Sequence, residues 1–482
     1  MKIVKLSIYG FLMSGLLAGF SSCVVQKQQS EQKMLAIPQK YPGIADTTAI
    51  GKISFRSFFK DTMLMKLIDT AIVNNLDLKN AMQRIMIARA NLLFQKGLRL
   101  PSLDGFVSAS VDKYGKYTMT GVGNFDTNLS QNIDKDQKVT NPVQDYYFGL
   151  KSSWEIDLWG KLKARKTSAQ AQLLATEKGR QWVITQLVAQ VASYYYELLA
   201  LDNRLEILNR NVNLQEKAVE IVQAQMEGGR ANALAVQQFT AQLLHTRSLQ
   251  YETLVEVTRL ENEMNLLMGR LAETPIPRGW SILEQPVSGQ IAEGIPADLL
   301  INRPDIQQAE WQLAATKADV EVARKSFYPS LVLTPYFAFN AFKFPLLFNG
   351  SSIAYGLLGG LTQPIFNRYQ LKTDFAVANA QQEIAYNEYK LSFLSAYKEV
   401  STNLRNIEYY KKILELNNEE VETLTSAVSI SNDLYLSAYA SYLEVITAQK
   451  GVLEAELQRT EARKALLLSF LDLYRCLGGG WE

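Results

Sequence analysis

The chain has 482 residues, with 50 basic and 48 acidic side chains, two cysteines and one histidine. This near balance of charge argues against a nucleic-acid-binding protein, which would carry a basic excess on one face. The few cysteines and histidines leave little material for a metal site or a disulfide framework, and we predict neither. No nucleotide-binding glycine loop and no catalytic triad pattern occurs, so the sequence offers no candidate catalytic residue.

The beginning of the chain has the layout of a secretory signal. Lysines within the first five residues precede an apolar stretch that ends at Phe20. A charged start, a short apolar run and small residues after it are typical of a signal peptide, and the run is too short to span a membrane as a helix. We therefore predict a signal peptide over residues 1–22 and a surface tether over residues 23–60.

Cys23, directly after two serines, resembles the cysteine of a bacterial lipobox. In such a motif the mature chain begins at the cysteine and carries covalent lipid, the only cofactor that we expect. Phe20 departs from the leucine that is usual in the motif, and an ordinary cysteine in a cleaved leader is the alternative. No later stretch of eighteen apolar residues occurs, so contact with a membrane must come from lipid, from strands, or from both.

The two halves of the chain repeat each other. The offset between matching residues is 228 at first, then 207, and finally 209. The matches include Asp77 with Asp305, Pro101–Leu103 with Pro329–Leu331, Gly149–Leu150 with Gly356–Leu357, Ala169 with Ala376, and Leu234 with Leu443. We expect repeat one over residues 61–269, an equatorial connector over 270–300, repeat two over 301–475 and a C-terminal segment over 476–482.

The changes of offset locate two differences in length. The first half has 21 extra residues between Leu103 and Gly149, and they are rich in Gly, Asn, Asp and Lys. Such composition predicts a solvated loop, because loops tolerate insertions. The later two-residue change falls in a stretch that we expect to be helical.

Four stretches alternate apolar and polar residues with the period of a strand. They form one predicted hairpin over about residues 102–158 and a second over about 330–365. Each run is about ten residues long, which is enough for a tilted strand to cross a bilayer. A half-buried sheet of a soluble protein is the alternative. Four strands cannot close a barrel, and open edges are not tolerated in lipid, so strands that span a membrane require several chains.

Long helices are predicted after each hairpin. Residues 161–227 contain no proline, and their apolar residues alternate spacings of three and four over about six heptads. A helix of this length is about 100 Å long and needs a partner alongside. Residues 231–267 supply one, and the second half repeats the pair over 371–435 and 441–473. A plain antiparallel coiled coil without a lumen remains the alternative.

Three motifs carry a resemblance to a known family. They are L-I-N-R-P-D-I from Leu300, W-E-I-D-L-W-G-K over 154–161 and L-Y-R-C-L-G-G-G-W over 473–481. Together they resemble the TolC superfamily of outer-membrane efflux proteins, in particular its lipid-anchored NodT/OprM-type branch, and the first and third motifs are specific when found together in this order. The resemblance covers nearly the whole chain.

The resemblance implies a mixed membrane protein in the bacterial outer membrane. It implies a homotrimer with a twelve-stranded β-barrel, four strands from each protomer, continuous with a long periplasmic α-helical barrel. The resemblance implies no enzymatic chemistry: such a channel passively conducts solutes from a periplasmic adaptor and an inner-membrane resistance-nodulation-division transporter. The alternatives are the exit duct of a type I protein secretion system, a heavy-metal efflux channel and a non-transporting coiled-coil lipoprotein. The alternating strands oppose the last.

The resemblance also implies which residues form the functional end. The two helix reversals would contact the adaptor, and the residues at those tips are Gly228, Gly229, Arg230, Ala438 and Tyr439. The periplasmic aperture would be formed by Tyr435, Leu443 and Glu444. Three copies of an acidic side chain around an axis would attract cations, and three leucines would resist wetting. Alternatively, Leu443 is a seam residue and Glu444 a solvated charge. Thr447 and Ala440 depart from an acidic residue and an arginine that relatives often carry.

Local chemistry assigns other residues to architecture. Pro304 and Asp305 suit the first turn of a helix, with Asn302 as its cap, so Arg303 is not expected to bind substrate. The remaining candidates are expected to be structural or solvated rather than metal-binding or reactive. Met82 and Met86 are predicted to lie in the core. Cys476 is predicted to be packed, and His245 to be solvated or hydrogen-bonded.

Overall fold

The computed structural model describes residues 54–286, 303–437 and 439–481. Cys23, Asn302 and Ala438 therefore lie outside the described residues. The chain forms two compact units, each described by itself. One consists of Gln95–Thr167 and Lys317–Gln382, and the remaining described residues form the other. Each unit contains parts of both repeats.

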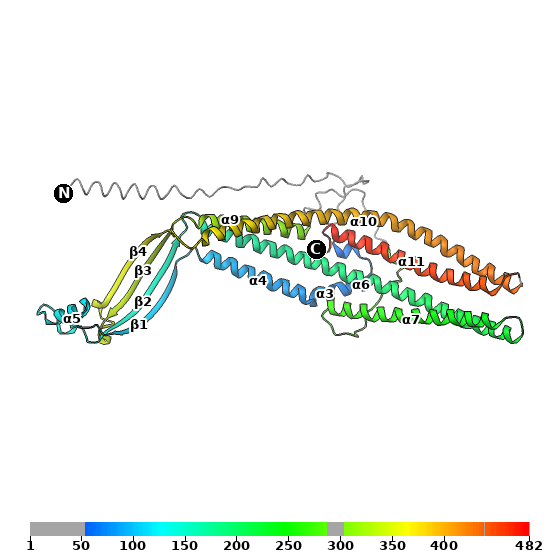
Figure 1. Ribbon diagram of the computed structural model, residues 1–482, viewed down its shortest axis with the longest axis horizontal. Coiled ribbons are helices and arrows are strands. Elements are labelled where there is room, and N and C mark those ends of the chain that lie inside the picture. The colour runs from blue at the N-terminus through cyan, green and yellow to red at the C-terminus, as the bar shows by residue number, and fades with distance from the viewer. Residues whose placement is uncertain (1–53, 287–302, 438, 482) are drawn as a thin grey trace. The chain divides into compact units, whose positions relative to one another are not determined.

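The first unit contains a four-stranded antiparallel sheet in the order β1-β2-β3-β4 (Figure 1). The strands are β1 (Ser102–Asp112), β2 (Val143–Ile156), β3 (Ser330–Ala341) and β4 (Ile353–Thr362). Both predicted hairpins are present, and the pairing of β2 with β3 joins the two repeats into one sheet. Among the described strands, β1 and β4 each pair on one side only. The sheet therefore ends in two open edges.

The connection between β1 and β2 differs from the predicted loop. It contains helix α5 (Met119–Leu129), which begins at the capping residue Thr118. The Thr118 hydroxyl accepts a hydrogen bond from the amide of Gly121 at 3.1 Å, and the Asn128 side chain holds Val139 by two hydrogen bonds of 2.8 and 2.9 Å. The helix buries none of its residues. The segment is thus solvated, as expected, but ordered by side-chain caps.

Two shorter helices correspond at an offset of 228, and they precede the hairpins. They are α4 (Leu76–Gly97) and α9 (Pro304–Lys325). Two helices without described counterparts, α2 (Phe55–Phe58) and α3 (Thr62–Asn74), precede α4. The start of α9 at Pro304, with Asp305 in its first turn, confirms the prediction made from R-P-D-I.

The four long helices correspond to each other at an offset of 209 at both ends. They are α6 (Lys161–Glu227), α7 (Ala233–Leu267), α10 (Gln370–Leu436) and α11 (Tyr442–Cys476). The prediction that the two-residue change lies within a helix is therefore wrong. It lies in the connection between β4 and α10, where Arg368 and Tyr369 take the left-handed φ values of 52° and 66°. The matching of Ala169 with Ala376 is displaced by two residues for the same reason.

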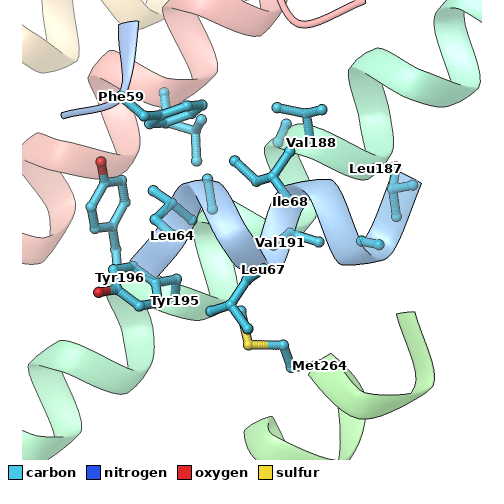
Figure 2. Packing of buried hydrophobic residues seen from close by; sticks show 14 of the residues in the cluster. Phe59, Leu64, Leu67, Ile68, Leu187, Val188, Val191, Tyr195, Tyr196 and Met264 are labelled. Atoms are coloured by element: carbon cyan, nitrogen blue, oxygen red, sulfur yellow. The ribbon is translucent and has the colours of Figure 1, made fainter. Parts of the chain in front are cut away.

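The core of the second unit forms where α3 packs between α6 and α7 (Figure 2). Leu64 and Ile68 of α3 lie against Val188 and Val191 of α6, and Met264 of α7 closes the cluster. The heptad positions of α6 are all buried or half-buried. The period of the sequence thus predicted which face of α6 is covered.

Two predictions about side chains outside this core had opposite outcomes. Met82 and Met86 are not in the core of the chain: their exposed fractions are 46% and 58%. They belong to an uncovered apolar face of α4 that also includes Ile87 and Phe94. Cys476, in contrast, is fully buried as predicted. None of the helices in the described part of the chain is both long and apolar enough to cross a bilayer.

Candidate functional site

The two helix reversals are copies of one turn. In the first, the Arg230 amide donates to the Gln225 carbonyl at 2.7 Å; in the second, the Tyr439 amide donates to the Leu434 carbonyl at 2.8 Å. Gly229 has a φ of 73°, which glycine adopts at low cost. The first reversal leaves Gly228, Gly229 and Arg230 exposed, and the second exposes Tyr439. Most of the predicted tip residues are therefore accessible in the chain.

Tyr435 ties the end of α10 to the end of α6. Its hydroxyl donates to the Gln225 side-chain oxygen at 2.5 Å. The two helix pairs also share an apolar cluster near their tips, in which Val222 and Phe239 are packed by Tyr442 of α11. The hydrogen bond is thus the polar part of a contact that holds the two reversals together.

Leu443 and Glu444 lie in the first turn of α11, and both are exposed. Ser441 caps this helix: its hydroxyl accepts from the Leu443 amide at 3.3 Å and also donates to the Glu444 carboxylate. This hydrogen bond from the Ser441 side chain, with help from backbone amides, holds the pKa of Glu444 below its usual value. The carboxylate is therefore part of the helix cap and remains charged at neutral pH.

The first repeat lacks this carboxylate. Asn232 caps α7 by accepting from the Ala235 amide at 3.0 Å, and Ala235 is fully buried in the tip cluster. Ala235 corresponds to Glu444 at the offset of 209. The two tips thus share a backbone turn, but only the second presents a negative side chain at this position.

Arg303 directly precedes α9 and is not part of the helix reversals; it is 1% exposed. Its guanidinium donates to Asp305 at 2.8 and 3.0 Å, to Glu399 of α10 at 3.1 Å and to the Cys476 carbonyl of α11 at 2.9 Å. Burial lowers the pKa of Arg303, but the hydrogen bonds and charges of Asp305 and Glu399 outweigh it, and the pKa is raised. Arg303 thus joins three helices, in agreement with the predicted architectural role.

A matching junction occurs in the first repeat. The Asn75 side chain donates to the Leu267 carbonyl at 2.9 Å and accepts from the Leu78 amide at 2.9 Å. Leu267 corresponds to Cys476, and both residues end a long return helix. Each repeat therefore closes by the same contact, between the start of its short helix and the end of its return helix.

A second buried polar cluster attaches the described part of the connector. The Asp61 carboxylate accepts from the Tyr195 hydroxyl at 2.6 Å and from the Gln285 amide at 2.8 Å. Tyr195 in turn accepts from the Gly279 amide at 2.8 Å. Burial raises the pKa of Asp61, but these hydrogen bonds and two from backbone amides outweigh it, so the pKa lies below its usual range.

Two other candidates from the sequence are Cys476 and His245. Burial, the largest effect, raises the pKa of the Cys476 thiol to about 12, so it is not a nucleophile at neutral pH. His245 is exposed. Within residues 54–286, 303–437 and 439–481, no three His, Cys, Asp or Glu side chains are placed to hold a metal ion.

Sequence reasoning missed the partners of the predicted residues. Gln225, which binds Tyr435, and Glu399, which binds Arg303, lie on other helices, so spacing gives no signal for them. Ser441 could have been found, because Ser-x-x-Glu before an apolar run is the pattern of a capping box. Asp61 before the helical pattern of α3 was likewise a readable cap.

Comparison with known proteins relates this geometry to a family. The model of the outer membrane efflux protein family matches residues 67–270 and 295–479. The solvent efflux pump outer membrane protein SrpC of Pseudomonas putida is 28% identical over 488 residues, covering 100% of this chain and 99% of SrpC. The cation efflux system protein CusC of Escherichia coli strain K12 is 28% identical over 429 residues, covering 88% of each chain.

Solved structures have the same fold. A crystal structure of CusC has a TM-score of 0.80 and 26% identity, covering 92% of this chain and 97% of that chain. The open state of the Neisseria gonorrhoeae outer membrane channel MtrE has a TM-score of 0.82 and 21% identity, covering 94% and 98%. Because the family model matches most of the chain, and because the reversals and junctions repeat as the predicted duplication requires, this chain belongs to the outer membrane efflux protein family and is the outer-membrane channel of an efflux pump.

Proposed function

We propose that three copies of this chain form one continuous exit duct for solutes delivered by a periplasmic adaptor and an inner-membrane resistance-nodulation-division transporter. The open edges of the sheet carry the proposal. In lipid every backbone N–H and C=O group must be paired, and the outer sides of β1 and β4 are not paired within the described chain. A neighbouring copy supplies β4 to β1, and three copies close the sheet.

The side chains of the edge strands support the same assembly. Leu103 and Val107 of β1, and Leu357 and Leu361 of β4, are exposed in the chain. An apolar face of strands about ten residues long suits the hydrocarbon of a bilayer. A soluble half-buried sheet would need a covering layer over these residues, and the first unit contains none among its described elements.

The covalent lipid on Cys23 is a further proposal, since this residue lies outside the described part of the chain. Its support is the position of Cys23 directly after an apolar stretch and two serines. Mass spectrometry of the purified protein should find an N-terminal peptide that begins at a diacylated Cys23. A mature chain that begins elsewhere without lipid would contradict the proposal.

We also propose that the second reversal carries the periplasmic aperture. The support is the exposure of Leu443 and Glu444 on the first turn of α11, together with the Tyr435–Gln225 hydrogen bond that fixes the end of α10. Glu444→Ala, and Leu443→Ala combined with Tyr435→Phe, should each raise the single-channel conductance. His245→Ala is the matched control on an exposed helical position. Unchanged conductance in both aperture variants would show that these side chains do not constrict the duct.

The function is tested first in detergent and planar bilayers. The purified full chain should migrate as a heat-sensitive trimer and conduct ions; a non-conducting monomer or dimer would refute the proposed duct. Deletion should then raise the sensitivity of cells to small toxic compounds. Loss of a secreted protein with unchanged sensitivity would favour a type I secretion duct instead, and increased sensitivity to metal ions alone would favour the heavy-metal alternative, as the name of CusC suggests for that relative.

A further inference from the structure

The sheet has one polar and one apolar face. Residues opposite each other in the strand register lie on the same face, so Asp104 and Lys151 share one. The hydrogen bond of 2.6 Å from the Asn340 side chain to Asp145 lies on this face too. The other face is apolar, and its exposed side chains include Val107, Leu150, Phe337, Tyr355 and Leu357. In the proposed duct the polar face therefore lines the lumen and the apolar face contacts lipid.

The connection between β3 and β4, residues 342–352, packs on the apolar face. We call it the second outer loop. The ring of Phe348 stands edge-on to the rings of Phe148 and Phe339, with centroids 5.6 and 5.7 Å apart. Phe344 meets Tyr146 in the same way at 5.5 Å. Because Phe148, Phe339 and Tyr146 all point to the apolar face, the loop folds back over the lipid side of the sheet and not over the lumen side.

The loop is folded, yet its two rings remain largely uncovered. Leu347, between them in the chain, is 4% exposed, and the Ser352 hydroxyl donates to the Leu346 carbonyl at 2.7 Å. Phe344 and Phe348 nevertheless keep exposed fractions of 62% and 64%. Apolar surface that is presented to water in an ordered loop is unfavourable unless another phase or partner covers it.

The position of the rings identifies the covering phase as lipid. They lie where the hairpins end, since β4 begins at Ile353, opposite Phe339. In the proposed duct this is the extracellular end of the apolar band, the level at which outer-membrane barrels carry aromatic side chains. The rings also continue the surface formed by Phe337 and Tyr355, which faces lipid in that assembly.

Lys343 supplies the polar side of the same boundary. Its amine lies 5.5 Å from the centroid of the Phe342 ring and donates to the backbone carbonyls of Lys135 and Asp136 at 3.3 and 2.8 Å. These carbonyls belong to the connection between β1 and β2, so Lys343 ties the second outer loop to the first. A lysine that reaches polar groups directly beside an apolar ring is the arrangement typical of a membrane interface.

We propose that the second outer loop of each copy is a lipid-binding collar, in which Phe344 and Phe348 enter the acyl chains of the outer leaflet beside the barrel. This inference rests on the proposed membrane-spanning barrel and adds that this loop binds lipid and does not close over the exit. Lys343 holds the first outer loop at the polar side of the collar.

Spin labelling of the full chain in liposomes tests the collar. A nitroxide on Phe348→Cys should collide with oxygen, which concentrates among acyl chains, several-fold more often than with a water-soluble nickel chelate in power-saturation measurements. Tyr117→Cys is the matched control: this aromatic residue of the first outer loop is fully exposed, and its label should favour the nickel chelate. The unsubstituted chain, labelled in the same way, gives the background from its own cysteines.

The other outcomes at position 348 overturn the inference. More frequent collision with nickel would place the loop in water, and little collision with either reagent would place it against a neighbouring copy. Phe344→Cys gives an independent reading if Phe348→Cys does not assemble. A label on Leu357→Cys of β4 separates the two proposals: oxygen contact there with nickel contact at Phe348 overturns only the collar, whereas nickel contact at both overturns the proposed barrel itself.

Discussion

Arg303→Met should destabilise the protein more than any exposed charge deletion. The substitution keeps an unbranched apolar stem but removes the guanidinium and its hydrogen bonds to Asp305, Glu399 and the Cys476 carbonyl. Breaking a buried ion pair by removing one partner costs about 3–5 kcal/mol. The remaining carboxylates keep 20% and 30% of their side-chain exposure, so we expect the lower end, about 3 kcal/mol.

The expected change in melting temperature follows from the size of the chain. An unfolding entropy of about 2.1 cal/mol/K per residue over 482 residues gives about 1 kcal/mol/K, so the midpoint should fall by about 3 °C. Differential scanning calorimetry of the detergent-solubilised protein measures this shift. Arg324→Met is the control, because Arg324 forms an exposed pair with Glu321 on its own helix. Equal midpoints for the Arg303 and Arg324 variants would refute the argument.

Three further outcomes are expected. Asp61→Asn should lower stability by about 2 kcal/mol at pH 7. Because the pKa of Asp61 is lowered in the folded protein, this contribution should shrink as the pH falls below the ordinary pKa of an aspartate and disappear below the folded pKa; a stability difference that does not shrink on acidification would contradict it. Gly479→Ala places a Cβ 2.4 Å from the ring of buried Tyr474, so it should cost about 1–3 kcal/mol, while Gly97→Ala, with nothing within 4 Å, should not destabilise. The Cys476 thiol, with its pKa raised to about 12, should resist alkylation at pH 8 until the protein unfolds; rapid labelling of the native protein would count against its burial.

The sequence was most informative where a regular spacing of apolar residues is repeated many times. The limits of α6 and the covered face of its heptads were predicted, because an apolar repeat over six heptads fits only a long helix packed against a partner helix. The strands were equally readable, because alternation over ten residues favours one register. The pairing of β2 with β3 was not predicted. The alternation of apolar and polar residues identifies each strand, but it does not show which strand of the other repeat lies beside it.

Short features were predicted less well, for reasons visible in particular residues. Helix α5 depends on the Thr118 cap and the Asn128 pair with Val139, which composition alone does not reveal. Met82 and Met86 were assigned to the core from spacing, but spacing identifies an apolar face and not what covers it. The proposed aperture rested on matched positions, and the structure added that the Ser441 hydroxyl holds the Glu444 carboxylate, a capping pattern that was readable in the sequence.

The closed core described above has a consequence for the order of synthesis. Tyr474 stacks on Phe58 with ring centroids 4.1 Å apart, and Trp481 is packed against the same cluster, so residues from the two extremes of the described chain complete one another. A chain that stops before Tyr474 lacks this stacking contact and the hydrogen bond from Arg303 to the Cys476 carbonyl. A truncated chain should therefore be cleaved by proteases faster than the full chain, because the contacts that join its two ends are missing.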